Sequence, residues 1–423
     1  MANDLLENIG GVQISIKRTM KNLWAIIITL ISIKMKKINL LMFGSLVVAV
    51  CFFTTNAMAQ QTPVNTYSIK GWWGPPSPPF SPVVNADRSI TFRVKAPKAV
   101  SVNLLFGEWD VKPQPLTKDS MGVWSVTINS VQPDIYSYVF NIDGVQVPDM
   151  NNPVTKIGTQ IYSSIVEVPG TPARFDEVQN VPHGVLQSCR FWSSVLNRVR
   201  AFNVYFPSQY FTEPKRRFPV LYLRHGGGDN ETSWSQPAGR ADVILENLIA
   251  RQKAVPMIIV MPNGLTDGSW AGGSTPEGMK ALEQELLSDV MPWVEKNCRV
   301  LPGRENCAIT GLSMGGGQAF VMGLRNLDKF AWVGEFSAGL LSDKDFKVDE
   351  LLPGIVNASN LNDKLKLFWI GCGKDDPRYN GHLALIDLLN KRGVRNEFHD
   401  TPGGHEWKVW RVELAGFMQK VFQ

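Results

Sequence analysis

A serine inside a glycine-rich turn is the residue of this chain best suited to covalent chemistry. The segment Gly311-Leu312-Ser313-Met314-Gly315 has the pattern G-x-S-x-G. Residues 307–310 before it predict a short buried strand, and residues 316–326 after it predict a helix. This order is that of a nucleophile elbow, because a sharp turn between strand and helix pushes the serine hydroxyl out of the sheet. The alternative interpretation is a plain glycine-rich turn of an α/β protein.

A serine hydroxyl needs a base to take its proton, and the base needs an acid to orient it. His405 is the best candidate base, since it lies in a glycine-flanked loop before the last predicted helix. The alternative interpretation is that His405 is an ordinary surface histidine. α/β-Hydrolases place the acid between the serine and the histidine, just after a strand. The apolar run at 367–371 leads to Asp376, which is our choice, and to Asp375, which is the alternative.

Two backbone amides are candidates to stabilise a developing oxyanion. The first is that of Met314, which follows the serine and lies at the positive end of the helix. The second should come from the loop after an early strand, and we predict Gly227 in the run Gly226-Gly227-Gly228. His225, directly before that run, is predicted to be a structural residue beneath the oxyanion hole rather than a second base.

Strands and helices alternate from residue 183 onward and would position these residues. The predicted strands are 199–206, 220–223, 257–261, 307–310, 331–336 and 367–371. The predicted helices are 239–251, 279–297, 316–326, 381–392 and 406–421. This order implies a mostly parallel sheet with helices on both faces. The sequence therefore predicts an α/β class protein with an α/β-hydrolase fold over residues 183–423.

The preceding residues, 83–170, have a different sequence pattern. Short alternating strands are predicted at 89–94, 101–106, 123–128 and 136–142, with turn signals between them. Such spacing is typical of a small immunoglobulin-like β-sandwich. A Pro-rich linker at 60–82 and a second linker at 171–182 would flank this module.

Residues 1–59 are predicted to be a leader that contains a signal peptide. Met35 begins a basic start followed by an apolar run, and Ala57-Met58-Ala59 fits the small-residue cleavage rule. We therefore expect Met35 to be the true start, cleavage after Ala59, and a secreted or periplasmic mature protein.

Composition is that of an ordinary globular protein, with 44% hydrophobic and 19% charged residues. Four of the five net positive charges lie in residues 1–59. Nothing therefore indicates a nucleic acid partner or, for the mature form, a membrane partner; the oligomeric state stays open. An exported chain can hold disulfides, so Cys298 and Cys307 could pair, with free buried thiols as an equal alternative.

Five motifs of the C-terminal region occur in a characteristic order. They are Val220 to Gly228, Ile258 to Gly264, Ile309 to Gly316, Cys372-Gly373-Lys374-Asp375-Asp376 and Gly403-Gly404-His405-Glu406-Trp407. Together they resemble carbohydrate esterase family 1, with its feruloyl esterases, acetyl xylan esterases and esterase D-like proteins. The resemblance implies Ser313 as nucleophile, His405 as base and Asp376 as acid, with no metal and no cofactor. The chain departs from the family at Cys298 and Cys307, where relatives tend to have Tyr and Arg.

The N-terminal module also has a resemblance. Residues 92–97, 122–125, 136–138 and 143–144, followed by 149–153, are similar to the module that precedes glycogen-branching and isoamylase-type enzymes. Some such modules bind carbohydrate and others serve only in packing. We slightly favour packing for residues 83–170.

The combined layout resembles exported esterases that act on plant cell walls. It implies that the substrate is a plant cell-wall polysaccharide or a feruloylated oligosaccharide. The enzyme would release ferulate, and acetate as a second acyl group, from xylan. Trp234, Trp270 and Trp407 are predicted on loops near the cleft, where they could stack on an aromatic acid; the alternative is core packing. A siderophore trilactone esterase of the enterobactin type and a non-catalytic glycan-binding protein remain as alternatives. The export signal argues against the first and the intact triad against the second.

Overall fold

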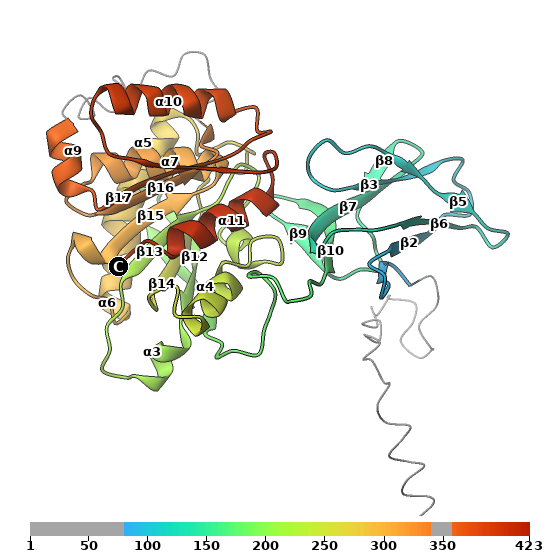
Figure 1. The fold of residues 1–423 in the computed structure, drawn as a ribbon, viewed down its shortest axis with the longest axis horizontal. Coiled ribbons are helices and arrows are strands. Elements are labelled where there is room, and N and C mark those ends of the chain that lie inside the picture. The colour runs from blue at the N-terminus through green and yellow to red at the C-terminus, as the bar shows by residue number, and fades with distance from the viewer. Residues whose placement is uncertain (1–79, 340–357) are drawn as a thin grey trace, which may run out of the picture. The chain divides into compact units, whose positions relative to one another are not determined.

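The computed structural model describes residues 80–339 and 358–423 (Figure 1). These residues lie within one compact unit, residues 66–423. The predicted leader, with its start at Met35 and cleavage after Ala59, lies outside the described residues, as does most of the predicted linker at 60–82. Within the described ranges, no helix combines the length and the hydropathy needed to cross a membrane.

Residues 83–168 form two antiparallel sheets. The four-stranded sheet has the order β1 (Val83–Val84), β2 (Ile90–Lys95), β6 (Val123–Ile128) and β5 (Thr117–Lys118). The six-stranded sheet runs β4 (Gln114–Pro115), β3 (Val102–Phe106), β7 (Asp134–Ile142), β10 (Ile161–Val168) and β9 (Thr155–Ile157), with β8 (Val145–Val147) paired to β7.

Alternating side chains of these strands meet in one hydrophobic core. In β2, Ile90 and Phe92 are fully buried, and Phe92 contacts the ring of Tyr138 from β7 edge-on. The Tyr138 hydroxyl donates to the Asp149 carboxylate, which satisfies both buried polar groups. The period-two pattern therefore produces the small β-sandwich expected from the sequence.

Residues 185–401 contribute an eight-stranded sheet. Its order is β11 (Val185–Ser193), β12 (Arg198–Phe206), β14 (Ile258–Pro262), β13 (Val220–Arg224), β15 (Cys307–Gly311), β16 (Trp332–Phe336), β17 (Leu367–Gly373) and β18 (Glu397–Thr401). β11, β12 and β14 pair antiparallel, and the pairs from β14 to β18 are parallel. This is the mostly parallel sheet that the sequence predicts.

The helices of this region connect the strands. They are α3 (Ser208–Thr212), α4 (Ala241–Ala250), α5 (Pro276–Glu285), α6 (Met291–Asn297), α7 (Ser313–Arg325), α9 (Ala358–Lys364), α10 (Tyr379–Lys391) and α11 (Trp407–Met418). A π-helical segment, Leu286–Val290, joins α5 to α6. The helix predicted over 279–297 is thus one nearly continuous run with a single-turn widening in the middle.

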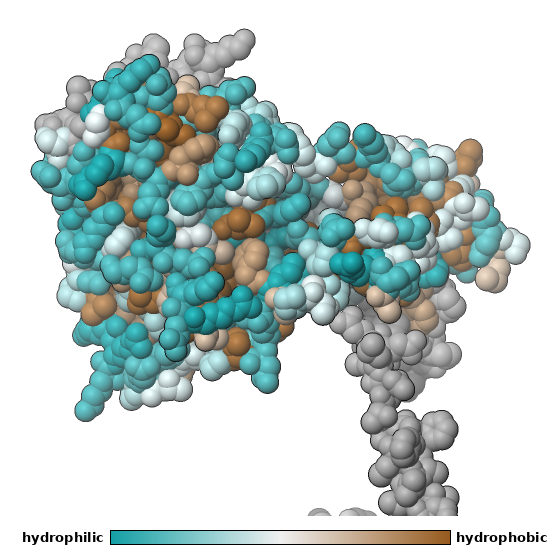
Figure 2. Space-filling model, viewed as in Figure 1, coloured by the Kyte–Doolittle hydropathy of each residue, from teal (hydrophilic) through white to brown (hydrophobic). Residues whose placement is uncertain are grey.

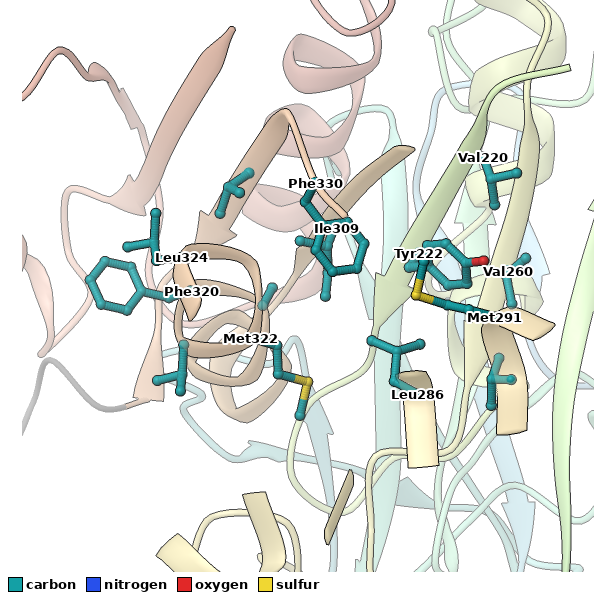
Figure 3. Close-up of a cluster of buried hydrophobic side chains, with 14 of the residues drawn as sticks. Val220, Tyr222, Val260, Leu286, Met291, Ile309, Phe320, Met322, Leu324 and Phe330 are labelled. Carbon is teal, nitrogen blue, oxygen red and sulfur yellow. The ribbon is translucent and has the colours of Figure 1, made fainter. Parts of the chain in front are cut away.

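Two hydrophobic clusters lie on opposite faces of the sheet. One includes side chains of α5, α6, α7 and α10 packed on alternate strand residues such as Tyr222 and Ile309 (Figures 1 and 3). The other includes side chains of α4 and α11 packed on Leu221 and Leu223. The central strands are buried on both faces and consequently read as continuous apolar runs. On the face shown in Figure 2, exposed hydrophobic residues lie in small separate groups among hydrophilic ones.

The structure differs from the prediction at several elements. α7 begins at Ser313, not at residue 316, and β11 and β18 were not predicted. β11 is mostly exposed because it is an edge strand, and β18 carries His399 and Asp400 in its middle. Neither strand therefore has the apolar pattern that identifies a buried strand.

Candidate active site

Ser313 sits at the junction of β15 and α7, where the chain turns sharply. Its φ of 51° is in the left-handed region, which a non-glycine residue adopts only when its surroundings enforce it. Gly315 provides the necessary close packing, since a Cβ there would lie 2.3 Å from the carbonyl oxygen of His225. β13 and α7 thus approach each other closely and hold Ser313 in the strained turn.

The structure brings the predicted serine, histidine and acid into one hydrogen-bonded line. The Ser313 Oγ lies 2.9 Å from His405 Nε2. His405 Nδ1 lies 2.7 Å from Asp376 Oδ2. The three residues come from the β15–α7 turn, the loop before α11 and the loop after β17. The parallel strands end at the same edge of the sheet, and this is why residues far apart in the chain can meet.

The surroundings of Asp376 keep it charged. Burial raises the pKa of this carboxyl, but the hydrogen bond and charge of His405 lower it. The Arg378 backbone N–H, 2.9 Å from Oδ1, and the Ser337 hydroxyl lower it further. The net result is a pKa below the ordinary value of 3.8. Asp375, by contrast, is exposed, so the structure favours Asp376 as the partner of His405.

Two further residues lie close to the imidazole of His405. The ring of Trp410 contacts it edge-on, with centroids 4.8 Å apart. An Arg378 guanidinium nitrogen lies 3.4 Å from His405 Nδ1 and 3.9 Å from Asp376 Oδ1. A ring held by Asp376 at Nδ1 presents Nε2 to Ser313, which is the arrangement that lets a neutral imidazole accept the serine proton.

Met314, and the loop that carries Gly227, lie close to the serine. Met314 is the second residue of α7, so its N–H is among those that have no partner within the helix. Gly226 lies so near that a Cβ there would be 3.4 Å from the Ser313 Cβ. Gly227 follows in the same loop. The structure therefore places the Met314 amide, and the loop that carries Gly227, next to the nucleophile. The role of the Gly227 and Met314 amides as an oxyanion hole stays a prediction.

His225 is confirmed as a structural residue. The Gly264 N–H donates to its Nε2 at 2.7 Å, so the proton is on Nδ1, which lies 2.9 Å from the Gly226 carbonyl oxygen. Burial lowers the pKa of His225 to about 3. A neutral histidine with both nitrogens used this way holds the Gly226 loop in place and has no nitrogen left to act as a base.

The three candidate tryptophans separate into two groups. Trp234 is 1% exposed, packs in the cluster under α4 and α11, and donates from Nε1 to the Arg224 carbonyl oxygen. Trp407 is 3% exposed and contacts Trp234 edge-on. The predicted stacking of these two on substrate is therefore wrong, because packing closes both rings off from solvent. Trp270, 60% exposed, lies against the Gly227–Gly228 backbone and stays a candidate.

Sequence reasoning missed residues of the N-terminal sandwich that lie near this site. Trp109 packs against Gly404, the neighbour of His405, and Glu108 accepts a hydrogen bond from the Trp407 N–H. Tyr162 lies against Gly228. No local pattern marks these residues, since their position depends on how the sandwich packs on the loops around Ser313.

Other candidate groups can be placed as well. The four cysteines of the described residues, Cys189, Cys298, Cys307 and Cys372, are free thiols, so Cys298 and Cys307 do not pair in this structure. Burial raises the pKa of Cys298 to about 11. Within residues 80–339 and 358–423, no group of three or more His, Cys, Asp or Glu is arranged to hold a metal ion.

Comparison with known proteins gives related sequences over most of the chain. An endo-1,4-beta-xylanase/feruloyl esterase of Xylanibacter ruminicola is 32% identical over 351 residues, 81% of this chain and 46% of that protein. The chain thus spans less than half the length of this relative. An esterase of Mycobacterium tuberculosis is 25% identical over 331 residues, 68% of this chain and 69% of that protein.

A solved structure is similar as well. The enterobactin esterase of Shigella flexneri matches 78% of this chain and 92% of its own, with a TM-score of 0.60 and 16% identity. That likeness concerns the fold alone, and it supports the predicted α/β-hydrolase fold. Residues 193–421 match the model of the family described as "Putative esterase". Because this match covers more than half of the chain, the protein belongs to that esterase family.

Proposed function

We propose that this protein is a serine carboxylic ester hydrolase that releases ferulate, and acetate as a second acyl group, from plant cell-wall xylan. The observation that carries the proposal is the line of Ser313, His405 and Asp376, with contacts of 2.9 and 2.7 Å. The name of the Xylanibacter ruminicola relative supports a feruloylated xylan substrate. The predicted leader supports action outside the cytoplasm. Residues 183–423 would carry catalysis, and residues 83–170 would form the attached module.

In the proposed reaction, His405 Nε2 takes the Ser313 proton as Oγ attacks the ester carbonyl carbon. The Gly227 and Met314 amides donate to the oxyanion, and the negative charge of Asp376 stabilises the imidazolium. The C–O bond to the sugar then breaks, and His405 returns the proton to the leaving sugar oxygen, which departs as a hydroxyl group. Water, activated by the same histidine, hydrolyses the acyl-serine and releases the free acid.

Trp270 is the proposed contact for an aromatic acyl group. Its ring is exposed and lies beside Gly227, so a flat hydroxycinnamoyl ring bound at Ser313 could stack on it. An aromatic pair of this kind contributes about 0.5–1.5 kcal/mol beyond area burial. Trp270→Ala should therefore raise KM for methyl ferulate by about two- to tenfold and leave p-nitrophenyl acetate unchanged. Equal losses on both substrates would show that the ring acts only by supporting the glycine loop.

The decisive experiment is a substrate panel with purified wild type and Ser313→Ala. Methyl ferulate, acetylated xylan, p-nitrophenyl acetate and a cyclic tricatecholate lactone represent the competing substrates. We expect hydrolysis of the ferulate ester by wild type and a fall in kcat of about 10⁴ or more in the folded variant. Activity on acetylated xylan alone would indicate an acetyl esterase, and rapid cleavage of the lactone alone a siderophore esterase. Retained activity in Ser313→Ala would refute the mechanism.

A further inference from the structure

The β9–β10 hairpin of the N-terminal sandwich packs directly on the loop that carries Gly227. The Thr159 N–H donates to the Gly228 carbonyl oxygen at 2.7 Å. Asn230 of the same loop donates from Nδ2 to the Gly158 carbonyl oxygen at 3.1 Å. The two backbones are so close that a Cβ on Gly158 would lie 2.1 Å from the Gly228 oxygen. The hairpin turn and the glycine loop are therefore joined by one backbone–backbone and one side chain–backbone hydrogen bond, and their close approach leaves little room for either to move.

A nearly buried ion pair ties the same two segments together. Lys156 of β9 has its Nζ 2.6 Å from Asp229 Oδ1, and the two side chains are 15% and 5% exposed. The ammonium also lies 4.8 Å from the centroid of the Tyr162 ring, where a cation–π contact adds to the pair. Asp229 follows Gly228 directly, so the pair holds the loop one residue from its contact with Thr159. A charge pair excluded from water depends strongly on both partners.

The opposite side of the loop is also held. The Gly228 N–H donates to the Trp270 carbonyl oxygen at 2.7 Å, a backbone contact that does not depend on the Trp270 ring. Gly226, at the start of the loop, reaches Ser313. The contacts thus run without interruption from the sandwich hairpin through residues 226–230 to the nucleophile.

We infer that the N-terminal sandwich is part of the catalytic machinery, and that Lys156 is a positioning residue which holds the Gly227 amide toward the oxyanion. This inference rests on the proposed function of Ser313. It predicts that the sandwich supports hydrolysis of every ester, including small ones that have no sugar for a carbohydrate-binding surface to contact. A module that acts only by binding polysaccharide would have no effect on such substrates.

The test compares Lys156→Met with a matched control on the adjacent strand. Glu167 of β10 pairs with Arg240 of the C-terminal region at 2.6 Å, which is a similar contact away from the glycine loop. We expect Lys156→Met to lower kcat on p-nitrophenyl acetate and methyl ferulate alike by about 10- to 100-fold, with KM little changed, because a misplaced donor costs transition-state stabilisation. Glu167→Gln should keep the wild-type kcat, and Lys156→Arg should recover most of the loss.

Hydrogen exchange provides a readout that does not require activity. The peptide covering residues 224–232 should exchange faster in Lys156→Met and at the wild-type rate in Glu167→Gln. A kcat loss in Lys156→Met that is limited to methyl ferulate would overturn the inference. An equal kcat loss in Lys156→Met and Glu167→Gln, or unchanged exchange of residues 224–232 in Lys156→Met, would overturn it as well. If wild type hydrolyses none of the esters, the proposed function fails, and the exchange experiment still decides whether Lys156 holds the loop.

Discussion

Replacement of Asp376 by asparagine is the sharpest test of the proposed triad. The side chain is fully buried, and its Oδ2 lies 2.7 Å from His405 Nδ1. Asparagine has nearly the same shape, so packing is preserved while the charge is lost. Its amide can donate to Nδ1, which leaves the imidazole proton on Nε2, facing Ser313. A histidine in that tautomer cannot accept the serine proton.

The expected loss follows from two effects of the same substitution. The base is in the wrong tautomer, and the imidazolium loses the carboxylate that stabilises it. Together they should lower kcat by about 10⁴, equivalent to about 5.5 kcal/mol of transition-state stabilisation. Asp375→Asn is the matched control. Its side chain is exposed, and the contact this residue makes with the histidine loop is from its backbone N–H to the Gly403 carbonyl oxygen. We expect this variant to retain nearly full activity.

Initial rates on p-nitrophenyl acetate and methyl ferulate between pH 6 and 9 measure both variants. Thermal melts should show each to be folded, so that a rate loss can be assigned to chemistry. The reverse ranking, with Asp375→Asn the inactive variant, would refute the assignment of the acid. A loss of less than about tenfold in Asp376→Asn would show that His405 does not depend on this carboxylate.

Three further predictions concern stability. Burial raises the pKa of Glu413 from 4.5 to about 7. Between these two pH values the folded protein keeps a proton that the unfolded chain has lost. The free energy of unfolding should therefore fall by roughly 3 kcal/mol as the pH rises from 4.5 to 7. Glu413→Gln should therefore raise Tm at pH 8 and not at pH 4.5. The same Tm difference between variant and wild type at both pH values would contradict this. Gly315→Ala should lower Tm and activity together, because its Cβ would meet the His225 and Arg224 backbone at 2.3 and 2.7 Å. Trp234→Phe removes the hydrogen bond to the Arg224 carbonyl and should cost about 1–3 kcal/mol in urea unfolding with activity retained; a specific loss of ferulate binding would restore its predicted substrate role.

Most of the C-terminal fold could be predicted because its signals are local. Strands such as Ile258–Pro262 are buried on both faces and read as apolar runs, and the helices between them have a clear periodicity. The G-x-S-x-G turn and the chain order of serine, acid and histidine predicted Ser313 as nucleophile and His405 as base, and the structure places the two side chains 2.9 Å apart. The strands β11 and β18 were not predicted, because edge strands face solvent and do not have the apolar pattern of a buried strand.

Tertiary packing decided what neighbouring residues in the sequence could not. Asp375 and Asp376 are adjacent and chemically identical, and only burial behind the imidazole distinguishes them. Trp234 and Trp270 were both predicted on loops near the cleft, yet one ring lies in the core and the other at the surface.

The contact of Lys156 with Asp229 joins residues 73 positions apart, and no local pattern encodes it. The sequence by itself determined which groups are candidates for the chemistry, because residue type and local periodicity are properties of short segments. The positions of those groups, and the part the sandwich plays beside them, depend on packing between distant segments, which only the folded structure decides.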